Sequence, residues 1–118
     1  MTKRLLLVDD EKNIRLTVRR SLSGVDLEIV EAPSGEEALE RLALIDFDLM
    51  LLDLRLPGIS GMELLERMSE LGISVKTVVI SAHGTIDLAV RLLKEGVLDF
   101  IEKPFSPDEI RDIVGKYL

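Results

Sequence analysis

Short, mostly apolar runs alternate with amphipathic segments along this chain. Five such runs lie at residues 4–8, 27–32, 49–52, 77–80 and 100–102. A short run that is apolar at successive positions fits a strand buried on both faces, as in a parallel sheet. The pattern therefore predicts five short strands.

The segment after the first run has helical spacing. Ile14, Val18 and Leu22 lie at i, i+4 and i+8, so their side chains share one face of a helix. Asp10 is predicted to be the N-cap of this helix, and Gly24 lies where the helix is expected to stop.

Four further helices are predicted from the same kind of spacing. They cover residues 35–42, 61–71, 85–95 and 107–117. The second and fifth helices follow the sequences SGEE and SPDE, which are typical of a capping box. In the fourth helix, we expect Val90 and Leu93 on the inward face.

Five strands that alternate with five helices predict a doubly wound α/β fold, with a five-stranded parallel sheet and helices on both faces. Right-handed crossovers leave few strand orders, and 2-1-3-4-5 is a common one. At 118 residues, the chain is expected to form a single domain, residues 1–118. Ligands bind such sheets at the carboxyl ends of the strands, so the residues that follow each strand are the candidates for a site.

Composition excludes several kinds of function. Acids outnumber bases by 22 to 15, and a net charge of -7 argues against a nucleic-acid-binding face. The chain has no cysteine and one histidine, which removes disulfides, thiolate sites and histidine-rich zinc sites. No apolar run approaches the roughly 18 residues of a membrane span. We therefore expect a cytoplasmic domain that binds neither nucleic acid nor membrane.

Polar side chains follow four of the predicted strands. Asp9 and Asp10 follow the first strand, Asp53 the third, Ser81 the fourth and Lys103 the fifth. Each alone has an ordinary explanation, such as a helix cap for Asp10 or solvated surface for Lys103. Their occurrence together at one edge of the sheet indicates a functional site.

Three carboxylates at one edge repel one another, by about 4 kcal/mol per pair at ~4 Å and an effective dielectric of roughly 20. Proton uptake or a divalent cation can offset this, and the crowding predicts a raised pKa for at least one of them. Oxygen ligands without His or Cys favour Mg²⁺, or Mn²⁺ in its place. Because Mg²⁺ typically combines one or two carboxylates with phosphate oxygens, we expect phosphoryl chemistry here, with Asp53 as the nucleophile.

The segments that carry these residues resemble the receiver domain of bacterial two-component response regulators. The matching segments are residues 7–11 (LVDDE), 53–58 (DLRLPG), 81–84 (SAHG) and 99–105 (DFIEKPF). The resemblance covers essentially the whole chain and implies the flavodoxin-like receiver fold. It implies a signalling switch in which a sensor histidine kinase phosphorylates Asp53. Such a domain is not an enzyme, and it catalyses only its own phosphorylation and dephosphorylation.

The resemblance also implies a set of metal ligands. Asp10 and Asp53 are expected to bind Mg²⁺ directly, Asp9 mainly through water, and Arg55 through its backbone carbonyl. The Arg55 and His83 side chains flank the site, and we expect them to set how fast water hydrolyses the acyl phosphate.

Further roles concern the phosphoryl group and the switch. The resemblance implies that Ser81 and Lys103 hold the phosphoryl oxygens, and that the peptide bond before Pro104 is cis. Phe100 is expected to be the switch aromatic, which turns inward as Ser81 moves towards the phosphate. An ordinary core phenylalanine is the alternative interpretation.

The motifs at residues 81–85 and 99–105 are most similar to receivers of enhancer-binding AAA+ activators and of FixJ-like regulators. We therefore expect an output domain C-terminal to the receiver in a longer protein, and control of transcription. Leu88 and Leu92 are predicted to form an exposed apolar stripe, unless a neighbouring helix covers them. A homodimer is expected through the face made by the fourth helix, fifth strand and fifth helix.

Three other functions are consistent with such a fold. A haloacid-dehalogenase-type phosphatase needs a second aspartate two residues after the nucleophile, where this chain has Arg55. A flavodoxin-like FMN module needs a phosphate loop, and the acidic loop here would repel FMN. A degenerate receiver that serves only as an interaction module usually lacks the acids or the lysine, which are present here.

Overall fold

The computed structural model describes residues 2–82, 84 and 86–118, with only the backbone of Ile86. Ten elements alternate along this part of the chain: β1 (Lys3–Val8), α1 (Lys12–Ser21), β2 (Leu27–Ala32), α2 (Gly35–Leu44), β3 (Leu49–Asp53), α3 (Gly61–Glu70), β4 (Thr77–Ser81), α4 (Ile86–Lys94), β5 (Asp99–Glu102) and α5 (Pro107–Tyr117). Each predicted strand and helix is present, with small differences at its ends.

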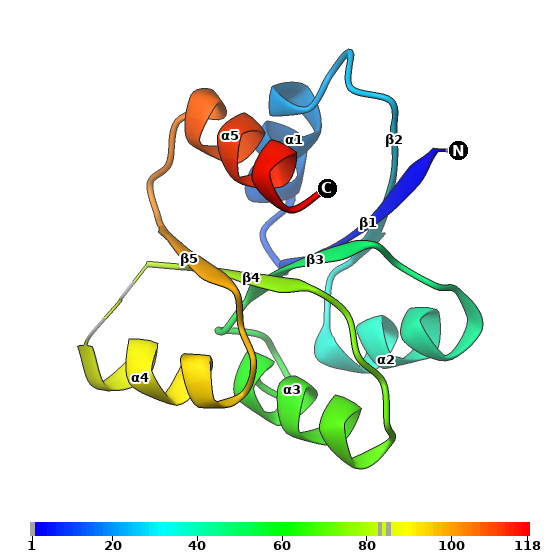
Figure 1. Cartoon of the computed structure of the whole chain (residues 1–118), viewed down its shortest axis with the longest axis vertical. Coiled ribbons are helices and arrows are strands. Elements are labelled where there is room, and N and C mark those ends of the chain that lie inside the picture. The colour runs from blue at the N-terminus through cyan, green and yellow to red at the C-terminus, as the bar shows by residue number, and fades with distance from the viewer. Residues whose placement is uncertain (1, 83, 85) are drawn as a thin grey trace.

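The five strands are parallel and lie in the order β2-β1-β3-β4-β5. Figure 1 shows α1 and α5 on one face of the sheet, and α2, α3 and α4 on the other. The predicted fold class and strand order are therefore confirmed. No helix among the described residues is long and apolar enough to cross a membrane.

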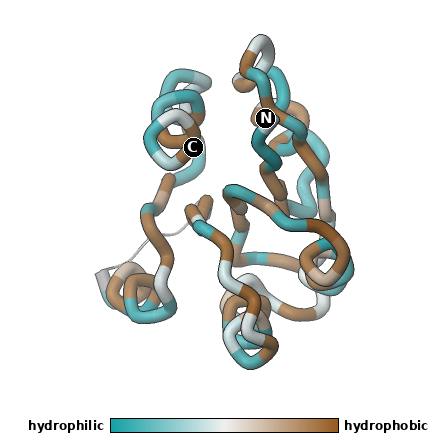
Figure 2. Tube along the Cα trace, turned by 45° about the vertical axis from the view of Figure 1, so that its right-hand side comes forward, coloured by the Kyte–Doolittle hydropathy of each residue, from teal (hydrophilic) through white to brown (hydrophobic). Residues whose placement is uncertain are grey.

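Each face of the sheet has its own hydrophobic core, because successive strand residues point to opposite faces. Leu5 and Leu7 pack with Ile110 beneath α1 and α5, whereas Leu6 packs with Leu64 on the other face. Brown, hydrophobic segments accordingly lie towards the middle of the trace in Figure 2. Burial on both faces explains why the sequence shows continuous apolar runs rather than alternation.

The start of α1 differs from the prediction. Asp10 is not the N-cap, because Glu11 occupies that position and its side chain makes no capping hydrogen bond. Asp9 instead accepts a hydrogen bond at Oδ1 from the Glu11 N–H, at 2.9 Å. The turn before α1 therefore fixes the Asp9 carboxylate, whereas Asp10 is exposed to solvent.

The two predicted capping boxes are formed to different extents. At α5, Ser106 and Glu109 exchange both hydrogen bonds, so the box is complete. At α2, the Ser34 hydroxyl accepts from the Glu37 N–H, at 3.2 Å. The return bond is not among the hydrogen bonds of the described residues, so this box is half formed.

The prediction for the exposed face of α4 is wrong. Leu92 is only 2% exposed, and Leu88 is partly buried against the same core. Val90 and Leu93, predicted to face inward, are 45% and 66% exposed. Apolar residues surround most of this helix, so spacing alone does not indicate which of them faces the sheet.

Candidate functional site

The register of the sheet brings the acids of the first and third strands together. Val8 pairs with Leu52, so Asp9 and Asp53 follow at adjacent strand ends. Carboxylate oxygens of Asp9, Asp10 and Asp53 all lie within 4.8 Å of one another. Asp9 is fully buried and Asp53 is 4% exposed. The structure thus gathers the three acids at one edge, as the strand ends predicted.

Lys103 extends into this cluster from the end of β5. Its Nζ lies 3.0 Å from Asp9 Oδ2, 3.2 Å from Asp53 Oδ2 and 3.8 Å from Glu11 Oε2. The Lys103–Pro104 peptide bond is cis, as expected. One ammonium therefore contacts both buried carboxylates, and Glu11 adds a further acid at the rim.

Ser81 lies beside Lys103 at the same edge. It is the last residue of β4 and is 3% exposed. Its backbone carbonyl accepts a hydrogen bond from the Lys103 N–H, at 2.8 Å. The structure thus places both predicted phosphoryl-binding residues at the site.

The remaining predicted residues surround the acids. Arg55 is exposed, and its backbone N–H donates to Asp53 Oδ1, at 3.2 Å. Phe100 is partly buried, and a Cβ added at Gly84 would lie 2.8 Å from its Cζ atom, so the ring packs directly against that backbone. His83 lies outside the described residues.

Burial controls the electrostatics of the site. It raises the pKa of both Asp9 and Asp53, because desolvation disfavours the charged form. Backbone hydrogen bonds and Lys103 oppose this rise, and repulsion among the acids adds to it. The predicted rise in pKa is confirmed, but burial rather than crowding is its main cause.

The pKa of Lys103 is raised in turn. Burial disfavours its charge, but contacts with Asp9 and Asp53 outweigh that penalty. Contacts between Lys103 and the two buried acids therefore favour the charged form of all three side chains. One positive charge faces two buried carboxylates and the exposed Asp10, so the group remains short of positive charge.

The donor set fits a hard divalent cation. Asp9 Oδ2 is buried, and among the described residues its partner is the ammonium of Lys103, at 3.0 Å, which Asp53 shares. An acceptor left in this way carries a desolvation penalty that a cation would relieve. All three candidate side chains supply oxygen, the ligand atom that Mg²⁺ prefers.

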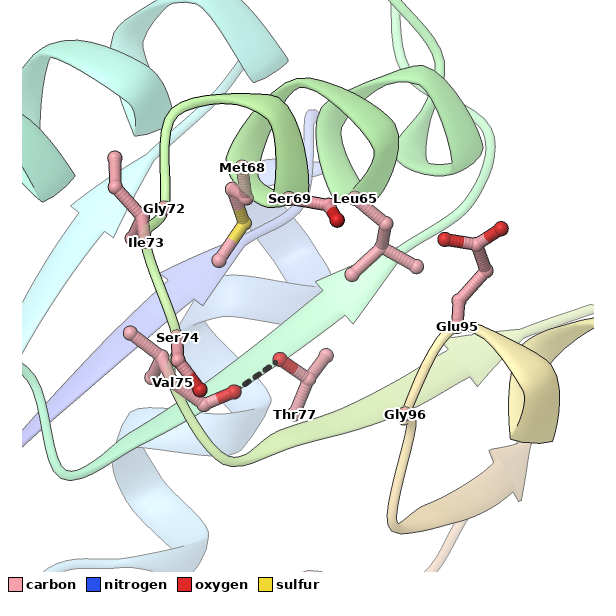
Figure 3. Close-up of a pocket in the computed structure, with 10 residues that line it drawn as sticks. All are labelled: Leu65, Met68, Ser69, Gly72, Ile73, Ser74, Val75, Thr77, Glu95 and Gly96. Carbon is pink, nitrogen blue, oxygen red and sulfur yellow. Dashed lines mark hydrogen bonds between the residues drawn. The ribbon is translucent and has the colours of Figure 1, made fainter.

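A cavity at the other end of the strands, near their amino ends, has a lining with little charge. It has a volume of about 330 Å³ and lies between the end of α3, the segment at residues 72–75 and the start of β4 (Figure 3). Among the described residues that line it, Glu95 is the only ionisable one, and the Thr77 hydroxyl donates a hydrogen bond to the Val75 carbonyl, at 2.9 Å. Converging charge, rather than cavity size, therefore identifies the functional edge.

Sequence reasoning missed two contacts around the acids. Glu11 reaches Lys103, and the Arg15 guanidinium donates to the backbone carbonyl of Asp9, at 2.8 Å. Glu11 could have been found as the third acid of the D-D-E run. Arg15 lies on the helix that follows, and no sequence pattern indicates that its side chain turns back to the strand end.

This fold and its acidic edge define a class of doubly wound α/β domains whose charged site lies at the carboxyl ends of the strands. Within that class, residues 5–115 match the response regulator receiver domain family, and the chain belongs to it. It is thus the receiver domain of a two-component response regulator, a signalling domain. Receiver domains are phosphorylated by histidine kinases and typically bind Mg²⁺ at an acidic pocket.

Individual relatives agree with this family. The chain is 34% identical to sporulation initiation phosphotransferase F of Bacillus subtilis (strain 168), over all of this chain and 95% of that protein. It is 35% identical to the DNA-binding transcriptional regulator NtrC of Escherichia coli (strain K12), over 93% of this chain but 24% of NtrC. The predicted resemblance to receivers of enhancer-binding activators is confirmed.

Solved structures show the same architecture. The signal receiver domain of a putative LuxO repressor protein from Vibrio parahaemolyticus superposes with a TM-score of 0.95 and 29% identity. The match covers 99% of this chain and 90% of that one. The chain therefore spans most of that receiver domain, but only about a quarter of a regulator such as NtrC.

Proposed function

We propose that Asp53 is the phosphoacceptor of a Mg²⁺-dependent switch. The observation that carries this is the position of its carboxylate, which is buried at the sheet edge, contacts Lys103 and lies among Asp9 and Asp10. Asp9 shares these contacts, but Asp53 is the last residue of the central strand β3 and accepts the Arg55 N–H at Oδ1. Residues 1–118 then act as one receiver domain, in the cytoplasm.

The same residues would hold the metal. Asp10 and Asp53 would bind Mg²⁺ directly, Asp9 through water, and Arg55 through its backbone carbonyl. The bound ion would neutralise charge on the transferring group. The Arg55 N–H already donates to Asp53 Oδ1, which leaves the other oxygen, Oδ2, on the side of Lys103.

In the reaction, an oxygen of Asp53 attacks the phosphorus of a kinase phosphohistidine. The new O–P bond forms as the P–N bond breaks, and the histidine nitrogen keeps the electron pair and takes up a proton. Lys103 exchanges its ion pair with Asp53 for a phosphoryl oxygen, and the Ser81 hydroxyl donates to another. Water later hydrolyses the acyl phosphate, at a rate set by Arg55 and His83.

We propose that the switch acts on the surface formed by α4, β5 and α5. As Ser81 moves towards the phosphoryl group, Phe100 turns inward and changes that surface. Val90, Leu93 and Leu98 expose apolar area there, and Leu93, Leu98 and Phe100 line an apolar hollow of about 200 Å³. A homodimer or a C-terminal output domain that controls transcription would bind this surface. If Leu93→Ser leaves phosphorylation-dependent dimerisation unchanged, this surface is not the contact.

Phosphoryl transfer is tested with a small donor. The protein is incubated with Mg²⁺ and acetyl phosphate, and its intact mass is measured. We expect a gain of one phosphoryl group that is lost in Asp53→Asn and retained in Asp48→Asn, an acid at the other end of β3. Steady release of phosphate from monoesters would indicate a phosphatase instead, and an unchanged mass would indicate a module that binds partners without phosphorylation.

A further inference from the structure

A carboxylate outside the acidic cluster contacts the loop that leads away from Asp53. Glu36, in the first turn of α2, accepts a hydrogen bond at Oε1 from the backbone N–H of Ile59, at 3.1 Å. Ile59 belongs to the loop at residues 54–60, between β3 and α3, which also contains Arg55. Glu36 therefore attaches α2 to the loop beside the candidate metal site.

The loop lies so close to α2 that a side chain at either of two glycines would displace a neighbouring side chain. At Gly58, whose φ is +72°, an added Cβ would lie 2.2 Å from Glu36 Oε2. At Gly35, an added Cβ would lie 2.5 Å from Cγ1 of Ile59. The Glu36 carboxylate thus rests directly on the backbone of the loop.

The two ends of the loop are fixed by other contacts. At its start, the Arg55 N–H donates to Asp53 Oδ1, at 3.2 Å. At its end, the Gly61 N–H donates to the Leu54 carbonyl, at 2.9 Å, and an added Cβ at Gly61 would lie 2.7 Å from the Asp53 carbonyl. Among the described hydrogen bonds, Glu36 supplies the one that ties the middle of the loop to α2.

We propose that Glu36 is a positioning residue for the metal site. By holding Ile59, it limits the conformations of the loop, so that the Arg55 carbonyl is already placed for Mg²⁺ when the ion arrives. A preorganised loop loses less conformational entropy on binding. This inference rests on the proposed function, in which the Arg55 carbonyl is a metal ligand.

The test measures the Mg²⁺ dissociation constant by calorimetry. The proteins compared are the parent, Glu36→Ala, Glu36→Gln and Glu40→Ala. Glu40 is an exposed acid one turn further along α2, so its removal controls for the loss of one negative charge. We expect Glu36→Ala to bind Mg²⁺ about tenfold more weakly, the lower end of the effect of removing a partner behind a metal ligand.

Glu36→Gln separates the hydrogen bond from the charge. Its amide oxygen can accept the same N–H, so we expect an affinity close to that of the parent, as for Glu40→Ala. Equal weakening in Glu36→Gln and Glu36→Ala would mean that charge alone matters and would overturn the proposal. An unchanged dissociation constant in Glu36→Ala would also overturn it.

A second measurement needs no metal. Hydrogen exchange of the Ile59 amide should accelerate in Glu36→Ala and stay slow in Glu36→Gln, whereas unchanged exchange in Glu36→Ala would show that the bond does not hold the loop. If the parent binds no Mg²⁺, the proposed function fails, and this inference fails with it. If the parent binds Mg²⁺ and all variants match it, only the inference about Glu36 fails.

Discussion

Two regions of this molecule hold their carboxylates in opposite ways. Glu31, in β2, lies between two arginines of α1, with Arg15 Nε 2.9 Å and Arg19 Nε 2.5 Å from its oxygens. Partial burial disfavours its charge, but the hydrogen bonds from Arg19 and Arg15 hold the pKa of Glu31 below its ordinary value. This acid is fully compensated within the fold.

At the sheet edge, Asp9 and Asp53 share Lys103, and burial raises the pKa of both. The folded protein therefore holds these charges at a cost to its stability. The comparison shows that an acid pair is a candidate for cation binding when its own contacts leave its charge incompletely balanced. Glu31 meets no such condition.

The largest expected effect comes from removing the shared cation. Lys103→Met leaves Asp9 and Asp53 buried without a counter-charge, so we expect the free energy of unfolding at pH 7 to fall by about 3–5 kcal/mol. Urea unfolding in EDTA measures this. Phosphoryl gain from acetyl phosphate should be lost as well, because the variant lacks the ammonium that we propose binds the phosphoryl group.

The matched control is Arg19→Met in the other region. Its ion pair with Glu31 is partly exposed and Arg15 remains, so the loss should be about 0–1 kcal/mol. If the two variants lose similar stability, the contrast between the two regions is wrong.

The pH dependence of stability should have opposite signs in the two regions. Because burial raises the pKa of Asp9, ionisation of this side chain destabilises the folded protein as the pH rises from 3.8 through the folded-state pKa. In metal-free protein, the free energy of unfolding of the parent relative to that of Asp9→Asn should therefore fall as the pH rises through this range. Denaturant unfolding at a series of pH values measures the difference.

Glu31 should behave in the reverse way. Its lowered pKa means that its contribution is present above 4.5 and is lost as pH falls through the folded-state value. The stability of the parent relative to Glu31→Gln should thus rise with pH across that range and then level off. Slopes of the same sign for both pairs would contradict the account.

The smallest expected effect concerns Asp10. Its charge contributes only weakly to the raised pKa of Asp53, so Asp10→Asn should raise the melting temperature of metal-free protein slightly, by about 2 °C. Scanning calorimetry in EDTA measures this. A melting temperature below that of the parent would show that Asp10 stabilises the fold through a contact other than repulsion.

The sequence predicted the sheet well because burial on both faces leaves a strong signal. The continuous apolar runs at β1 and β3 end on acids, so the strand order alone predicted that Asp9 and Asp53 lie close together at the carboxyl ends of the strands. The position of Lys103 near these acids was predicted in the same way, because the lysine comes directly after β5.

Other features could not be predicted because they depend on how elements pack. The burial of Leu92 is decided by the rotation of α4 on the sheet, which a helix apolar on most sides does not specify. The contact between Glu36 and Ile59 joins residues 23 positions apart through a backbone N–H, which leaves no pattern in side-chain types. Burial as the main cause of the raised pKa values also required the packed structure.

Calorimetric titration of the metal-free, unphosphorylated protein with Mg²⁺ tests the central claim most directly. The account predicts one bound ion per chain, with binding greatly weakened in Asp10→Asn and Asp53→Asn and preserved in Glu31→Gln. Absence of binding to the parent, or equal binding to Asp53→Asn, would contradict the claim that the incompletely balanced acids form a cation site.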